Sequence, residues 1–124
     1  ECLIADADEL GMSDDPSVRR QFGELRADVL AMRAMTYATV SSAARTDVPG
    51  PEGSMIKVFY ADLAQRIHRA RMEVIGAHGL DRGGRYAYDI GEYLYSYAST
   101  MGGGTSELQR DIVGERVLGL PRNR

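Results

Sequence analysis

Apolar side chains recur at alternating spacings of four and three residues along two long stretches of the chain. The first stretch follows Asp14-Asp15-Pro16, which is typical of a helix start because Asp accepts hydrogen bonds from free N–H groups and Pro suits the first turn. The spacing predicts a long amphipathic helix that ends near Arg45. The apolar face of this helix comprises Val18, Phe22, Leu25, Val29, Met32 and Thr36.

A second amphipathic helix is predicted after the rigid segment Asp47-Val48-Pro49-Gly50-Pro51. We expect it to start at Pro51-Glu52-Gly53-Ser54 and to end at Gly76-Ala77-His78-Gly79, where a left-handed residue can form the cap. Its apolar face comprises Ile56, Phe59, Leu63, Ile67, Ala70 and Val74. Because two long helices joined by a short turn pack antiparallel, the sequence predicts an all-α fold, an up-and-down helical bundle.

The tyrosine-rich segment has an ambiguous spacing. Its tyrosines fall largely at period two, which favours strands, at Tyr86, Tyr88, Tyr93, Tyr95 and Tyr97. An isolated strand would have no partner, so we expect a short helix from about Tyr88 to Ser99, with tyrosines in bundle or interface positions and their hydroxyls satisfied. Residues 1–13 are expected to be a linker or the end of a helix that begins upstream, and residues 14–124 the bundle domain.

Composition narrows the class of protein. A net charge of −3 over 124 residues gives no electrostatic reason to expect nucleic acid or an anionic membrane surface as a partner. Uncharged stretches such as Ala34–Ala44 are shorter than the roughly 20 apolar residues that span a bilayer. Cys2 is the only cysteine, which predicts no intrachain disulfide and a reducing, cytoplasmic location. His68 and His78 lack companions at helical spacing, so no metal site is predicted.

Three consecutive glycines, Gly102–Gly104, precede a predicted helix that begins at Thr105 and that Pro121 is expected to end. A backbone without Cβ atoms that runs into free helix N–H groups can approach a ligand closely and donate to anionic or carbonyl oxygens. The glycines alone favour a flexible loop before an ordinary helix, because they match neither of the phosphate-binding patterns G-x-x-x-x-G-K-S/T and G-x-G-x-x-G.

The segment that runs from these glycines through Thr105-Ser106-Glu107 to Leu120-Pro121-Arg122 resembles the C-terminal signature of the acyl-CoA dehydrogenases, flavoenzymes that oxidise the α,β bond of acyl-CoA thioesters. Gly50-Pro51-Glu52-Gly53-Ser54-Met55-Ile56-Lys57 is similar to a helix start in many bacterial members. Glu73-Val74-Ile75-Gly76-Ala77-His78-Gly79 is similar to the family's Q-x-x-G-G-x-G turn, which lies beside the ADP portion of a flavin, often that of a neighbouring subunit. The resemblance covers about residues 49–122 and implies the helical C-terminal domain of a longer, FAD-dependent oxidoreductase.

The resemblance implies cofactor contacts from two groups of residues. Thr105 and Glu107 are assigned to FAD, although an N-cap role for Thr105 and a helix-dipole role for Glu107 explain these residue types as well. Glu73, Gly76 and Ala77 are assigned to the turn beside the ADP portion. Glu73 stands where Gln is usual and Ala77 where glycine is usual, and a carboxylate near a pyrophosphate is unfavourable unless it meets a ribose hydroxyl or an adenine amine.

The position that often holds the family's catalytic glutamate is Gly103 in this chain. The backbone N–H remains, so Gly103 and Gly104 are assigned to the acyl-CoA thioester oxygen, where N–H donors stabilise enolate-like charge. The proton must then go to another base. Some members carry that base on the first long helix of the bundle, which we expect upstream of Glu1 in a longer chain, and neither Glu1 nor Glu9 is assigned to the role. Because most substrate and flavin contacts belong to other domains, this chain alone is expected to be inactive.

Arg19-Arg20-Gln21-Phe22-Gly23 is similar to the family's R-x-Q-F-G loop, which holds the flavin pyrophosphate, but it falls inside the first predicted helix. We therefore do not assign Arg20 to the cofactor, and we expect Gln109 in helix-surface or packing contacts. The resemblance implies an acyl-CoA substrate, an electron-transfer acceptor protein, and assembly as a homo-oligomer or heterotetramer. A non-catalytic assembly subunit or truncated relative is the main alternative, and an unrelated helical interaction module is another.

Overall fold

The computed structural model describes residues 2–46 and 50–122, so part of the predicted break, residues 47–49, lies outside the described residues. Within these ranges all regular secondary structure is helical, which confirms the all-α prediction and the helix expected in the tyrosine-rich segment. The elements in chain order are α1 (Cys2–Glu9), α2 (Pro16–Thr46), α3 (Glu52–Ile75), the 3₁₀ segment η1 (Gly76–Leu80), α4 (Ala87–Ser96), the 3₁₀ segment η2 (Tyr97–Thr100) and α5 (Ser106–Arg116). None of the helices in the described ranges is long and apolar enough to cross a membrane.

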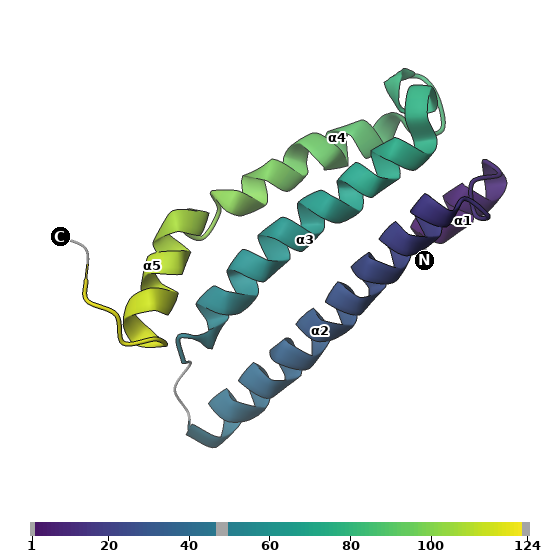
Figure 1. Ribbon diagram of the computed structural model, residues 1–124. Coiled ribbons are helices and arrows are strands. Elements are labelled where there is room, and N and C mark those ends of the chain that lie inside the picture. Colours follow the sequence, from purple (N-terminus) through teal and green to yellow (C-terminus); the bar gives the residue numbers. More distant parts are fainter. Residues whose placement is uncertain (1, 47–49, 123–124) are drawn as a thin grey trace.

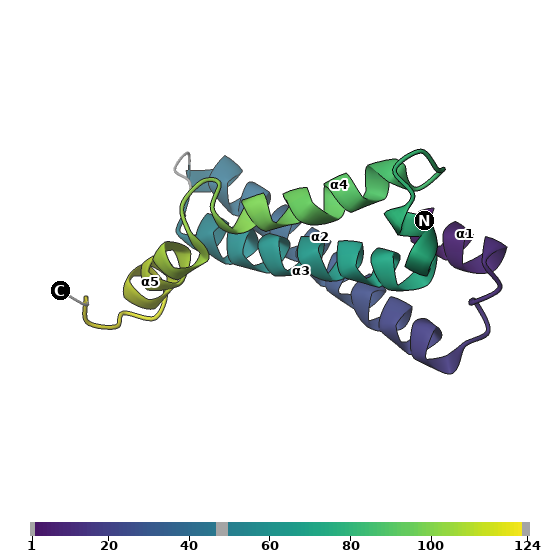
Figure 2. The same cartoon turned by 90° about the horizontal axis from the view of Figure 1, so that it is seen from above.

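Helix α3 is the central element of the fold. In Figure 1, α2 runs antiparallel along one side of α3, and α4 returns along the other, as expected for an up-and-down bundle. Helix α5 lies beside the first turns of α3, whereas α1 lies beside its last turns. Figure 2 shows α1 and η1 at one end of the molecule and α5 at the opposite end. Helix α3 therefore contacts all the other α-helices of the described chain.

The start of α2 confirms the predicted cap. Oδ1 of Asp15 accepts hydrogen bonds from the backbone N–H groups of Ser17, at 2.7 Å, and Val18, at 3.3 Å. A hydrogen bond from the Ser17 hydroxyl, followed by those from the two backbone N–H groups, holds the pKa of Asp15 below its ordinary value. Because the folded pKa is lowered, the stabilisation by this cap is complete above the ordinary Asp pKa and disappears as the pH falls through the folded value.

The core lies mainly between α2 and α3 and consists of two apolar clusters. Leu3 of α1 is partly buried and packs against both of them. The members from the two long helices lie on the apolar faces that the sequence predicts. The buried members are Ala7, Val18 and Val74 in one cluster and Leu25, Leu63 and Ala70 in the other.

The second half of α2 is less buried than its periodicity suggests. Val29 is 39% exposed, and Thr36, on the same predicted face, is also exposed. Tyr37 and Val40 are 62% and 61% exposed. Among the described helices, α3 is the one that packs along this half of α2, and it leaves some apolar side chains of α2 uncovered. Val29, Tyr37 and Val40 therefore expose apolar surface on α2.

Helix α3 ends at Ile75, directly before the predicted glycines, but the cap geometry expected there and the predicted end of α5 need correction. Gly76 has a φ of 50° and a ψ of −131°, which lies outside the left-handed helical region, and the chain continues into η1 instead of ending in a left-handed cap. Helix α5 ends at Arg116 and not at Pro121. The N–H of Leu118 bonds to the carbonyl of Val113 at 3.1 Å, so the chain turns before it reaches the proline.

Arg71 of α3 lies between two buried carboxylates from different helices. Its Nη2 is 2.9 Å from Oδ2 of Asp6 in α1, and its Nε is 2.9 Å from Oδ1 of Asp89 in α4. The side chains of Asp6 and Asp89 are only 7% and 10% exposed. Arg85 adds a second cation near Asp6 and pairs with Glu9. Oδ2 of Asp6 and Nε of Arg71 have no hydrogen-bond partner among the described residues, so Arg71 joins the three helices chiefly through the attraction between opposite charges.

We predict that Arg71→Met lowers the free energy of unfolding by about 3–5 kcal/mol, because Asp6 and Asp89 would stay buried without their shared cation. Urea unfolding followed by circular dichroism measures this loss. The control is Arg26→Met, which changes an exposed arginine of α2 and should alter stability by less than about 0.5 kcal/mol. Equal effects of the two substitutions would contradict the role given to Arg71.

Candidate functional site

The glycine loop, residues 101–105, connects η2 to α5 beside the first turns of α3. The N–H of Gly102 donates to the carbonyl of Ala98 at 2.9 Å and closes η2. Gly103 and Gly104 then take φ angles of 72° and 99°, a region that residues with a Cβ atom rarely adopt. The backbone path of the loop therefore explains why the sequence has glycine at both positions.

Two side chains bind the carbonyls of this loop. Nζ of Lys57, from α3, donates to the carbonyl oxygen of Gly104 at 2.6 Å and to that of Thr100 at 3.4 Å. Nε2 of Gln109, from α5, donates to the carbonyl oxygen of Gly103 at 2.8 Å, and Gln109 is buried. The sequence gives Lys57 no role and Gln109 only a general surface or packing role, because local spacing cannot show either contact.

The two glycines differ in the space around them. A Cβ atom at position 104 would lie 2.8 Å from Nε2 of Gln109, so Gly104 is needed for close packing as well as for its φ angle. A Cβ atom at position 103 would meet nothing within 4 Å. A side chain at position 103 would therefore project into open space, whereas one at position 104 would displace Gln109.

Thr105 caps α5 as the sequence predicts. Its Oγ1 accepts a hydrogen bond from the N–H of Leu108 at 3.3 Å. The pKa of Glu107, in the first turn, is lowered chiefly by a hydrogen bond from its own backbone N–H and then by one from the Thr105 side chain, with smaller contributions from the charges of Arg110 and Lys57. Thr105 and Glu107 line a surface depression of about 410 Å³ between α3, η2 and α5. A ligand in this depression would meet the Thr105 hydroxyl and the ionised carboxylate of Glu107, and Asp62 and Arg110 also line it.

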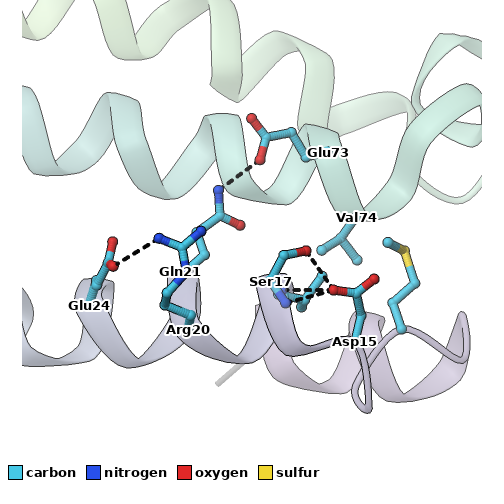
Figure 3. A pocket seen from close by; sticks show the side chains of 9 residues that line it. Asp15, Ser17, Arg20, Gln21, Glu24, Glu73 and Val74 are labelled. Atoms are coloured by element: carbon cyan, nitrogen blue, oxygen red, sulfur yellow. Dashed lines mark hydrogen bonds and ion pairs between the residues drawn. The ribbon is translucent and has the colours of Figure 1, made fainter.

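The other group of predicted cofactor residues lies at the far end of α3. Figure 3 shows Glu73 of α3 facing Gln21 of α2, whose Nε2 donates to Oε2 of Glu73 at 2.7 Å. Arg20 lies within α2, as predicted, and its nearest charged partner is Glu24, at 3.5 Å. The depression between them, of about 340 Å³, is also lined by Asp15. Three carboxylates around one arginine do not fit the negative charge of a pyrophosphate.

The structure does not bring the two predicted groups together. Gly76 and Ala77 lie in η1, directly after α3, and both are exposed. At about 1.5 Å per residue, α3 places Glu73 about 24 Å along its axis from Lys57, which binds the glycine loop. A contact made by Glu73, Gly76 or Ala77 in one chain is therefore separate from a contact made by its glycine loop.

The tyrosines of α4 and η2 form one defined polar contact. The hydroxyls of Tyr93 and Tyr97 are 3.1 Å apart, and their rings meet edge to face with centroids separated by 5.6 Å. Hydrogen bonds with the Tyr93 hydroxyl and then with Arg69 lower the pKa of Tyr97. The expectation of satisfied hydroxyls is confirmed for this pair. In the part of the chain that the structure describes, no group of three or more His, Cys, Asp and Glu side chains could hold a metal ion.

The chain is similar to known proteins over most of its length. A family model described as "Acyl-CoA dehydrogenase, C-terminal domain" matches residues 5–118. The chain therefore belongs to the acyl-CoA dehydrogenase family and corresponds to its C-terminal domain, as the sequence resemblance implies.

Curated relatives of this chain are acyl-CoA dehydrogenases of mycobacteria. The protein IpdE1 of Mycolicibacterium smegmatis is 34% identical over 121 residues, which cover 97% of this chain and 30% of that protein. IpdE1 of Mycobacterium tuberculosis is 33% identical over 121 residues, with 97% and 31% covered. FadE26 of Mycobacterium tuberculosis is 37% identical over 103 residues, with 78% and 26% covered. The chain thus spans less than a third of the length of these relatives.

Two solved structures with a similar fold have titles that each carry two protein names. The structure titled "Tcur3481-Tcur3483 steroid ACAD" matches with a TM-score of 0.83 and 28% identity over 98% of this chain and 33% of the other. The ChsE4-ChsE5 complex from Mycobacterium tuberculosis matches with a TM-score of 0.76 and 29% identity, covering 89% of this chain and 30% of the other. These matches extend over nearly the whole described bundle.

We predict that Gly104→Ala costs more stability than Gly103→Ala. Each substitution places a Cβ atom at positive φ, which costs about 1–2 kcal/mol, but only the one at position 104 would lie 2.8 Å from Gln109 and disturb its bond to Gly103. Thermal unfolding of the two variants side by side measures the difference. Equal melting temperatures would show that Gln109 does not hold the loop tightly.

Proposed function

We propose that the chain is the C-terminal domain of a longer, FAD-dependent acyl-CoA dehydrogenase that oxidises the α,β bond of an acyl-CoA thioester. The observation that carries this proposal is the glycine loop, whose carbonyls are bound by Lys57 and Gln109 while the N–H groups of Gly103 and Gly104 have no acceptor in the described part of the chain. N–H groups that are fixed before reaction can stabilise negative charge on an oxygen without having to reorganise.

In this proposal the loop acts on the substrate. When the α proton leaves an acyl thioester, negative charge develops on the thioester oxygen, and the N–H groups of Gly103 and Gly104 would donate to that oxygen. Gly103 has no side chain that can take the proton, so the base belongs to a segment outside residues 101–105, and an upstream helix of the bundle or a partner subunit is the proposed source. An electron-transfer acceptor protein would then reoxidise the enzyme.

The glycine-loop end of α3 also suits part of a flavin. The cofactor, when bound, would supply the acceptor for the β hydride. Thr105 has a hydroxyl that can donate, and the ionised Glu107 accepts hydrogen bonds only, so the pair suits hydroxyl and ring N–H groups rather than a phosphate. The carboxylates of Glu73, Asp15 and Glu24 do not suit a pyrophosphate. We therefore restrict the proposed role of Glu73, Gly76 and Ala77 to a ribose hydroxyl or adenine amine of a neighbouring subunit's flavin.

The similar solved structures support a substrate class and a mode of assembly. One is titled a steroid ACAD and both carry two chain names, so we propose a steroid-derived acyl-CoA as substrate and a heteromer of two related subunits as the assembly, with a homo-oligomer as the alternative. The absence of a carboxylate at Gly103 favours a second function, that of a non-catalytic assembly subunit. We place either form in the cytoplasm, in keeping with the single cysteine, Cys2.

Purification of the full-length protein, alone and together with a related subunit, separates these two functions. Each preparation is assayed for bound flavin and for acyl-CoA-dependent reduction of an artificial acceptor. Activity of the protein on its own supports the catalytic form. Activity that appears only with the second subunit and falls in Gly103→Ala supports a catalytic heteromer, whereas activity that needs the second subunit and survives Gly103→Ala supports the assembly form. No flavin and no activity in any combination would refute both.

We predict that Thr105→Val in the full-length protein lowers flavin retention more than Arg20→Ala does. Thr105 lies at the glycine loop, whereas Arg20 lies within α2 beside Glu24. Flavin absorbance per mole of protein after gel filtration is the measurement, and Thr105→Ser is the control that keeps the hydroxyl. Full flavin content in Thr105→Val with loss in Arg20→Ala would reverse both assignments.

We predict that the 124-residue chain self-associates as a dimer or tetramer through bundle helices. Each large apolar side chain that is removed from water contributes roughly 1.5–3 kcal/mol, and Leu30 and Val40 of α2 are 53% and 61% exposed. Leu30→Glu combined with Val40→Glu should weaken the association, whereas Leu118→Glu, located after α5, should not. Light scattering at micromolar concentration measures the mass, and a monomer near 13.6 kDa with a cooperative melt would contradict the prediction.

A further inference from the structure

Lys57 is the only lysine of the chain, and the other positions in its count of fifteen Lys and Arg residues are all arginines. It lies in the second turn of α3, with a half-buried side chain, and it reaches a loop that follows more than forty positions later in the sequence. In the described part of the chain its hydrogen-bond partners are two backbone carbonyls, those of Thr100 and Gly104. The one lysine side chain of this sequence is therefore used to bind main-chain atoms.

The two carbonyls lie at the two ends of the sharp part of the loop. Thr100 is the last residue of η2, and Gly104 precedes the N-cap of α5. One ammonium group with three N–H donors can bond two carbonyls that point in different directions. A guanidinium group, whose donors lie in one plane, is less suited to this geometry. The residue type thus matches the contact.

Because the peptide bond is planar, a bond to one carbonyl oxygen also fixes the direction of the N–H group of the next residue. In a trans peptide the N–H of one residue points opposite to the carbonyl of the residue before it. The bond from Lys57 to the Gly104 carbonyl therefore directs the N–H of Thr105 away from α3. In the same way, the bond from Gln109 to the Gly103 carbonyl directs the N–H of Gly104 away from the Gln109 side chain. Neither N–H has an acceptor among the described residues.

We propose that Lys57 is a positioning residue: by binding the carbonyls of Thr100 and Gly104, on both sides of Gly103, it fixes the glycine loop so that the N–H groups of Gly103 and Gly104 face the acyl thioester. This inference rests on the proposed function, and Gln109 fixes the adjoining peptide. Lys57 itself does not touch the substrate. Its effect on the reaction passes through the loop that it holds.

The first experiment measures the loop in the 124-residue chain, with ¹⁵N-labelled glycine and the variants Lys57→Met, Lys57→Arg and Arg26→Met. Lys57→Met keeps the apolar stem and removes the donors, so the amide signals of Gly102, Gly103 and Gly104 should shift and their heteronuclear NOE values should fall toward those of a mobile segment. Arg26, on α2, lines a different depression and is the control, whose substitution should leave these signals in place. Unchanged loop signals in Lys57→Met would overturn the proposal.

Lys57→Arg decides the outcome if Lys57→Met fails to fold. The arginine variant keeps the charge and the apolar stem, but its planar donors fit the two carbonyls poorly. We expect it to fold, with circular dichroism like that of the original chain, and to shift the same three glycine signals. A folded Lys57→Arg chain whose loop signals are unchanged would overturn the proposal.

The second experiment measures the reaction in the full-length enzyme. Misplaced N–H donors lose transition-state stabilisation, so kcat of Lys57→Met per bound flavin should fall roughly 100-fold, while KM for the acyl-CoA stays close to the original value. A normal kcat in a variant whose loop is mobile would refute the positioning role. If the unmodified full-length enzyme oxidised no acyl-CoA, the proposed function would fail, and the glycine signals would still report whether Lys57 fixes the loop.

Discussion

Helix α3 is enclosed by its neighbours, and each neighbour meets a chemically different part of its surface. Toward α2 it presents Leu63 and Ala70, which are almost completely buried. Toward α1 and α4 it presents Arg71, and toward the glycine loop it presents Lys57. The packing of one helix therefore positions both ends of the domain, and a change in its register would displace the glycine loop and the η1 end together.

The charges around Arg71 select one arrangement of the helices. Helix α1 has only eight residues, and an isolated helix of this length is marginal in water. Apolar contacts through Ala7 would allow it to rotate or slide, but the Asp6 carboxylate is close to the Arg71 guanidinium only in the observed orientation. Burying such charges has a substantial cost. The group therefore specifies where α1 lies more than it adds to the free energy of folding.

The parts of the fold that could be predicted from the sequence are those set by neighbouring residues. The caps at Asp15 and Thr105 bind N–H groups within three positions of themselves, so their residue types indicate the helix starts directly. The bond from Lys57 to the glycine loop and the bond between Gln21 and Glu73 join residues 47 and 52 positions apart. Spacing along the chain carries no information about such contacts. The cap geometry at Gly76 could not be predicted from the local sequence either, because it depends on the 3₁₀ segment η1 that follows.

The glycine loop is held by hydrogen bonds to its carbonyl oxygens, so its support does not depend on which residue type stands at position 103. A Cβ atom there would meet nothing within 4 Å. A side chain at this position costs only the strain of a positive φ. A carboxylate can therefore be gained or lost there while the surrounding contacts stay as they are. A change in this one codon could therefore add an acidic group beside the loop, while Lys57 and Gln109 would keep their bonds to the loop carbonyls.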